Sequence, residues 1–125
     1  MSNLIVFGSS RVDAFLSVPA DRAEKLCEID THKCVIELSY GAKIPLDNVE
    51  FLIGGNGANV AIGTKRLGVG SLLVAELGNG LLADYAKREL AREIDTKYFT
   101  QTKGVAQGLG AVIMYEGERT ILSYY

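Results

Sequence analysis

A glycine-rich turn constrains the fold of this chain more than any other segment. It has the sequence GGNGAN at residues 54–59, follows the short apolar run Val49 to Ile53 and leads into a stretch of small residues. Ala58, Ala61, Ile62 and Leu67 in that stretch fall near one face of a helix. The turn therefore predicts a strand that passes into a helix, where glycines let the backbone approach a ligand closely and the first turn offers free N–H groups.

Two well-known phosphate-binding loops do not fit this turn. The dinucleotide-binding fingerprint needs a third glycine where Asn59 stands, and a P-loop needs a following Gly-Lys-Ser/Thr, which is missing. The turn is therefore predicted to be neither of these two nucleotide-binding loops.

The segments around the turn predict a parallel sheet with helices. Leu4 to Phe7 and Leu72 to Leu77 are short, continuous apolar runs, as in strands that are buried on both faces. Gly68 stands where a glycine ends the first helix. A second apolar stripe, at Leu82, Tyr85, Ala86 and Leu90, predicts another helix. This β-α-β-α order is typical of an α/β core.

A second, smaller β element is expected from two separated segments, before residue 49 and after residue 97. Residues 34–40 alternate between apolar and polar side chains, which predicts a strand with one apolar face. Ala111 to Tyr115 and Thr120 to Tyr124 flank the sequence EGER and predict a β-hairpin. Asp21 to Glu28, after Pro19, predict a short helix.

Composition excludes several classes of function. The chain has 125 residues, the size of one domain, with 13 basic and 15 acidic residues and a net charge of -2, which argues against binding of nucleic acid or anionic lipid. No run approaches the roughly 20 apolar residues of a membrane span, and no signal peptide is recognised, so a cytoplasmic protein is expected. In that reducing setting Cys27 and Cys34 are expected to be free thiols.

Two side-chain clusters are given little weight. Cys27, Asp30, His32 and Cys34 are close in sequence, but their spacing fits no familiar zinc site, so no metal ligands are predicted. A nucleophilic Ser/His/Asp set is not expected either, because the chain has a single histidine in a predicted strand.

Asp13, Asn56 and Asn59 are the polar side chains best suited to a ligand with hydroxyl groups. Each amide supplies a donor and an acceptor, although an asparagine at a helix start can also be a simple cap. Asp13 comes shortly after the first predicted strand, where open α/β sheets form their ligand crevice. Its carboxylate could accept hydrogen bonds from vicinal hydroxyls, and the alternative is a solvated turn residue.

Four segments together resemble the start of a ribokinase-family (PfkB) sugar kinase. They are VFGSSRVDAFL (6–16), IGGNGANVAIGTKRLG (53–68), LLVAELGNGLLADYAKREL (72–90) and GAVIMYEGERTILSYY (110–125). The resemblance implies the N-terminal part of a ribokinase-like three-layer α/β/α fold with a small β-sheet lid. Residues 1–125 would then be an incomplete PfkB-type kinase domain, with core segments at about 1–15 and 49–97 and lid segments at about 16–48 and 98–125.

The resemblance also implies a substrate site. Asp13 would bind sugar hydroxyls, Gly54 and Gly55 would line the substrate, and Asn56 and Asn59 would form hydrogen bonds with it. A sugar or sugar-like small molecule is the partner that this site implies, and a homodimer through the lid is a further expectation.

Arg11 occupies a position where a polar side chain near the substrate is expected. Its guanidinium group could match a phosphorylated or acidic sugar, and the alternative is a solvated loop cation. The segment GNGLLA at 78–83 departs from the acidic turn usual in the family. What this turn contributes is therefore open.

The resemblance implies a kinase whose chemistry depends on residues that this chain does not supply. The family's GAGD-type segment, with its catalytic aspartate, and its ATP and magnesium sites would lie beyond Tyr125. The expected function is the substrate-binding part of an ATP-dependent carbohydrate kinase, inactive as this chain alone. Two alternatives remain: a noncatalytic sugar-binding or lid-mediated dimerisation module, and a nucleotide-binding α/β domain.

Overall fold

A three-stranded parallel sheet forms the core of the molecule. The computed structural model describes residues 4–28, 30 and 33–125. The core strands are β1 (Leu4–Phe7), β6 (Ser71–Asn79) and β7 (Phe99–Ala106), in the order β1-β6-β7. The apolar runs of β1 and β6 pair in parallel, and the mixed α/β class is confirmed. The expectation that β1 is buried on both faces is wrong: it lies at the edge of this sheet, and Leu4, Ile5 and Phe7 are 43%, 56% and 78% exposed.

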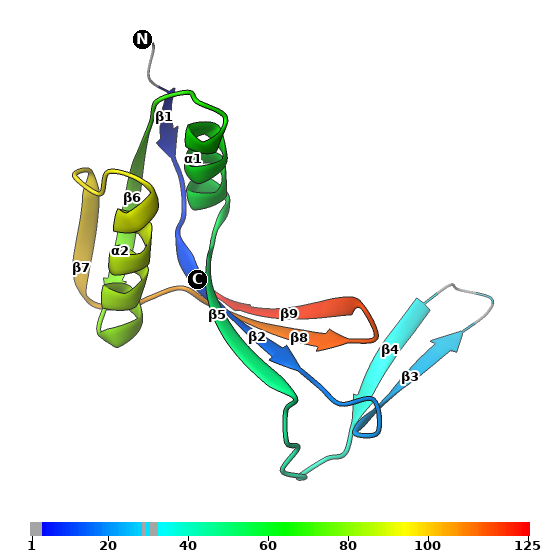
Figure 1. Cartoon of the computed structure of the whole chain (residues 1–125). Coiled ribbons are helices and arrows are strands. Elements are labelled where there is room, and N and C mark those ends of the chain that lie inside the picture. The colour runs from blue at the N-terminus through cyan, green and yellow to red at the C-terminus, as the bar shows by residue number, and fades with distance from the viewer. Residues whose placement is uncertain (1–3, 29, 31–32) are drawn as a thin grey trace.

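Helices α1 (Asn56–Arg66) and α2 (Leu81–Glu93) pack on the same face of this sheet (Figure 1). Leu73, Ala75 and Leu77 alternate along β6 and therefore point to one face, where they contact small residues of both helices. Helix α1 ends at Arg66, and Gly68 follows with a φ of 82°, so the predicted terminating glycine is confirmed.

A four-stranded sheet extends away from the core and forms the lid (Figure 1). Its strands, in order, are β5 (Asn48–Gly54), β2 (Arg11–Ser17), β8 (Leu109–Tyr115) and β9 (Glu118–Tyr124). Strand β2 is central, because it pairs antiparallel with β5 and parallel with β8. The predicted hairpin around Gly117 is confirmed as β8 and β9.

A separate two-stranded hairpin projects beside the lid and consists of β3 (Ala23–Glu28) and β4 (Lys33–Leu38) (Figure 1). The helix expected over residues 21–28 is therefore wrong. The side chains of β3 are exposed apart from that of Ala23, so helix and strand patterns are hard to distinguish there. Antiparallel pairing with β4, which sequence periodicity does not reveal, determines the strand.

The boundary between core and lid segments differs from the expected one. Residues 11–15 and 49–54, expected in the core, lie in β2 and β5 of the lid sheet, whereas β7, expected in the lid, pairs with β6 in the core. The reason is that each sheet assignment depends on a distant pairing partner. The predicted lid segment 16–48 supplies the end of β2, the start of β5 and the separate hairpin.

Val12 fixes the lid to the core. Its side chain is fully buried and packs with Leu77 of β6 and Ala86 of α2. The hydroxyl group of Tyr85 adds a hydrogen bond of 2.8 Å to the carbonyl oxygen of Phe51 in β5. The start of the lid is thus held against α2 by apolar burial and one polar contact.

Truncation of a buried leucine should lower the free energy of unfolding much more than truncation of an exposed one. Leu73→Ala is expected to lower the free energy of unfolding by about 2–5 kcal/mol, because Leu73 is fully buried and its removal leaves a cavity. Leu81→Ala is the matched control, since Leu81 is 89% exposed, and its effect should stay within about 0.5 kcal/mol. Urea unfolding followed by circular dichroism measures both, and equal losses would contradict the assigned core.

Candidate functional site

The carboxylate of Asp13 lies in a slot between two glycines of neighbouring strands. Asp13 is paired with Gly110 of β8, and Gly54 ends β5 on the other side. A Cβ atom built on either glycine would come closer than 3.0 Å to the carboxylate oxygens, a separation that real Cβ atoms essentially never show. The slot therefore exists because both neighbours lack a side chain, and the Asp13 side chain is only 13% exposed.

Arg11 neutralises this carboxylate from the same face of β2. Its Nε lies 2.8 Å from Asp13 Oδ1, and the Arg11 side chain is 17% exposed. The pair lacks hydrogen-bond geometry, and Asp13 Oδ1 is buried with no hydrogen-bond partner among the described residues. The oxygen is therefore in contact with the guanidinium group and closed to solvent, and the ion pair with Arg11 is its interaction in this structure.

Two residues at the end of the described chain hold the Arg11 side chain. Arg11 Nη1 donates to Ser123 Oγ at 3.3 Å and to Tyr125 Oη at 3.2 Å, and the guanidinium carbon lies 5.8 Å from the centre of the Tyr125 ring. Sequence reasoning missed Ser123, Tyr125 and Gly110. Gly110 directly precedes the predicted strand Ala111 to Tyr115, and a glycine in a strand often marks the close approach of another group.

The glycine turn holds the start of α1 against the β1–β2 connection. Gly55 has a φ of 97°, and a Cβ atom there would approach the Ser9 carbonyl oxygen to 2.6 Å. The same carbonyl oxygen accepts a hydrogen bond of 3.2 Å from the backbone N–H of Ala58. This contact fixes the helix start next to β2, and no side chain caps α1.

The two asparagines of the turn are exposed and lie on α1. Asn59 lines a cavity of about 530 Å³ along α1 and α2, whose lining does not include Arg11 or Asp13. In that cavity Arg66 donates to Glu93 Oε1 at 2.6 Å and thereby lowers the pKa of the Glu93 carboxyl group. The structure thus brings Arg11, Asp13 and Gly54 together and leaves the asparagine side chains outside the slot.

A smaller cavity of about 200 Å³ adjoins Arg11 where β6 and β7 meet the lid. The side-chain amide of Gln107 lines this cavity and joins two other lining residues. Its Nε2 donates to the carbonyl oxygen of Ser10 at 2.9 Å, and its Oε1 accepts from the N–H of Gly78 at 3.0 Å. Ser10 also lines it, and Ser10 Oγ is buried without a hydrogen-bond partner among the described residues. The region beside Arg11 can accommodate polar groups.

Cys27 and Cys34 form a disulfide, so the expectation of free thiols is wrong. The two residues are directly opposite in the register of β3 and β4, which places their Cα atoms 4.1 Å apart. His32, from the cluster given little weight as a metal site, lies outside the described residues. Across residues 4–28, 30 and 33–125, no three His, Cys, Asp or Glu side chains gather where they could hold a metal ion.

The described helices include none with the length and apolar character of a membrane span.

The fold and the slot define a class of protein: an α/β core with a β lid that carries a nearly buried carboxylate. The sequence matches the family described as pfkB family carbohydrate kinase along residues 25–125, and the chain belongs to this family. The resemblance expected from the sequence motifs is confirmed.

Two curated relatives illustrate the match. The chain is 28% identical to a ribokinase of Staphylococcus aureus over 127 residues, which covers 98% of this chain and 36% of that protein. It is 34% identical to an ATP-dependent 6-phosphofructokinase of Thermoanaerobacterium thermosaccharolyticum over 68 residues, 54% of this chain and 21% of the relative. This chain therefore spans about a fifth to about a third of the length of these relatives.

The fold is also similar to that of a solved structure. The ribokinase of Cryptococcus neoformans var. grubii serotype A in complex with ADP superposes with a TM-score of 0.71 and 21% identity, over 99% of this chain and 35% of that one. The expected ribokinase-like fold is confirmed.

The slot can be tested with two glycine substitutions that are expected to change the free energy of unfolding in opposite directions. Gly110→Ala should lower the free energy of unfolding by about 1–3 kcal/mol, because the new methyl group collides with the Asp13 carboxylate. Gly63→Ala in α1 meets no atom within 4 Å and should raise it by about 0.5–1 kcal/mol.

The double variant Asp13→Ala/Gly110→Ala identifies the cause. Removal of the carboxylate should restore most of the stability lost in Gly110→Ala, so the two effects are not additive. Additive losses in urea unfolding would mean that Gly110 is needed for a reason other than the slot.

Proposed function

We propose that this chain is the N-terminal, sugar-binding part of an ATP-dependent carbohydrate kinase that phosphorylates a sugar hydroxyl group. The observation that supports the proposal is the Asp13 carboxylate, which is held between Gly54 and Gly110, is paired with Arg11 and remains 13% exposed. A sugar supplies adjacent hydroxyl donors, which such an acceptor is suited to bind.

The neighbouring residues have separate roles in this proposal. Asp13 accepts hydrogen bonds from two hydroxyls, and Gly54 and Gly55 let the sugar approach the backbone. For Asn56 and Asn59 the proposed role, to supply amides to the sugar, rests on the family resemblance, because their exposed side chains lie outside the slot in this structure. Arg11 balances the charge of Asp13 across 2.8 Å and presents its guanidinium group at the edge of the slot.

The charge of Arg11 also affects which class of sugar the site could bind. A guanidinium group binds phosphate or carboxylate groups well, so a phosphorylated or acidic sugar is the charged alternative to a neutral one. A relative named 6-phosphofructokinase supports the phosphorylated alternative, and a relative named ribokinase supports a neutral sugar.

ATP is the proposed phosphoryl donor, with support from a relative named ATP-dependent and a structural neighbour described as an ADP complex. Transfer also needs a base and stabilisation of the phosphoryl group. The described residues do not fit a magnesium site, since no group of three candidate ligands gathers among them. In this proposal the chain binds and orients the sugar, and it is inactive by itself.

Asp13→Ala tests the sugar site. Loss of hydrogen bonds to a charged acceptor should weaken sugar binding by about 10- to 100-fold, as measured by calorimetry with ribose, fructose and fructose 6-phosphate. Asp21→Ala is the matched control, because its carboxylate is 74% exposed at the surface. In a longer chain that phosphorylates a sugar, Asp13→Ala should abolish most of the activity, and wild-type rates would refute the role of Asp13.

A second candidate function is self-association through the lid, as a noncatalytic binding or dimerisation module. One row of paired residues crosses the lid sheet from β5 to β9, in the order Phe51, Ala14, Ala111, Leu122. Phe51 is 48% and Leu122 60% exposed, whereas Ala14 is buried and the Phe51 ring contacts Tyr85 of α2, so the open apolar part of this face lies toward β9. A second copy of this chain could cover that face.

Sedimentation equilibrium distinguishes the dimer. The wild-type chain should associate reversibly, and Leu122→Lys should shift it to a monomer because a charge replaces an apolar contact. Leu67→Lys is the control, since Leu67 is 85% exposed and lies at the end of α1. A monomeric wild-type chain at high concentration would count against this module.

A further inference from the structure

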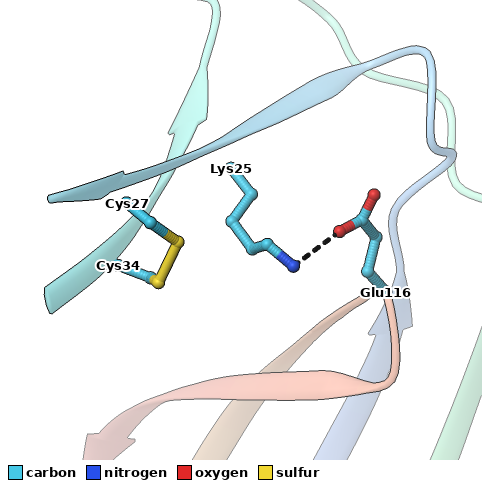
Figure 2. Close-up of a disulfide and its surroundings, with 4 residues drawn as sticks. All are labelled: Lys25, Cys27, Cys34 and Glu116. Atoms are coloured by element: carbon cyan, nitrogen blue, oxygen red, sulfur yellow. Dashed lines mark ion pairs between the residues drawn. A yellow bond between two sulfur atoms is a disulfide. The ribbon is translucent and has the colours of Figure 1, made fainter. Parts of the chain in front are cut away.

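The β3–β4 hairpin carries a cross-strand disulfide close to its tip. Figure 2 shows Cys27 of β3 bonded to Cys34 of β4, and the two residues oppose each other in the strand register. Both cysteines are exposed. The disulfide therefore links the two strands at a solvent-accessible position.

The hairpin has few other attachments. Over its described residues, 23–28 and 33–38, it pairs with no strand of the two larger sheets, and Leu26 and Val35 remain 48% and 50% exposed. A two-stranded hairpin of this kind is marginally stable in water. A covalent link between its strands is therefore expected to contribute to its order.

Two polar contacts hold the hairpin beside the lid. Tyr115 Oη donates to the carbonyl oxygens of Ala20 and Ala23, at 3.3 and 2.7 Å, near the base of the hairpin. Lys25 Nζ lies 2.9 Å from Glu116 Oε2 in the β8–β9 turn (Figure 2). The Glu116 carboxylate raises the pKa of Lys25, but both side chains are 47% exposed, so solvent weakens the attraction.

A cavity of about 480 Å³ separates the hairpin from β8 and β9. Its walls include both cysteines, with Ile36 on the hairpin side and Ile113 and Thr120 on the lid side. An exposed disulfide beside a cavity of this size is open to attack by a small molecule. The structure thus combines access to the sulfur atoms with a hairpin that depends on them.

We propose that the Cys27–Cys34 disulfide is a thiol–disulfide exchange site for low-molecular-weight thiols, and that its reduction releases the hairpin from the lid. A thiolate attacks one sulfur atom, the S–S bond breaks, and the other cysteine leaves as a thiolate that takes up a proton. A second thiolate attacks the mixed disulfide and frees the remaining cysteine. Two external thiols are oxidised to one disulfide, and two electrons reduce the protein.

The exchange site is separate from the proposed sugar site. Gly110 lies beside Asp13, and alternate side chains of a strand point to opposite faces, so Ile113 and Tyr115 of β8 lie on the face away from Asp13. The hairpin contacts that far face. Release of the hairpin should leave the slot intact, and failure of either proposal would not affect the other.

The test measures the redox state and the order of the hairpin together. The chain is equilibrated in glutathione buffers of increasing ratio of reduced to oxidised form, without denaturant, and the free thiols are trapped and counted by mass spectrometry. Hydrogen exchange is followed on the same samples. Reduction should proceed in the folded protein and make the amides of β3 and β4 exchange about tenfold faster or more, whereas those of β6 stay unchanged.

Matched variants keep the result interpretable. Cys27→Ser/Cys34→Ser should show fast hairpin exchange at every glutathione ratio, and Glu116→Gln should retain the disulfide with a smaller increase in exchange. The proposal is overturned if the disulfide resists glutathione until the whole chain unfolds. It is equally overturned if reduced and oxidised hairpins exchange at the same rate.

Discussion

The alternation of side chains along β2 is the constraint on which the rest of the structure depends. Val12 points to one face and is buried against Leu77 and Ala86, whereas Asp13 points to the other and enters the glycine slot. A slip of one residue in the register would exchange the two faces and place a carboxylate in the apolar core. The attachment of the lid and the chemistry of the site are therefore set by the same pairing of β2 with β5 and β8.

Much of the fold could be predicted because its local signals are strong. The apolar runs of β1 and β6, the glycine turn before α1 and the stripe of α2 each have one periodicity and clear ends. Strand β7 lacks such a signal, because TQTKG within Phe99–Ala106 is polar and pairs at the edge of the sheet. Its strand state comes from β6, a partner that local sequence does not identify.

Some residues of the candidate site could likewise be predicted from local sequence, whereas others depend on a distant strand. Asp13 and Gly54 were predicted from their place after a strand and before a helix, and the structure brings them into contact. Gly110 was missed because its importance depends on a neighbour 97 positions away in sequence, on a strand that pairs with β2. The disulfide was missed for a related reason: the expected cytoplasmic setting would favour free thiols, and only the register of the hairpin places the two sulfur atoms within bonding distance.

The ion pair between Arg11 and Asp13 bears on why such a slot suits hydroxyl groups. A nearly buried carboxylate without a counter-charge would be costly, and Arg11 offsets that cost. Arg11 Nε lies 2.8 Å from the buried Oδ1, so the ion pair occupies this oxygen, and an incoming hydroxyl would bind the part of the carboxylate that is still exposed. Gly54 and Gly110 hold the carboxylate in place, so a donor that enters the slot meets an acceptor that is already oriented and needs little reorganisation.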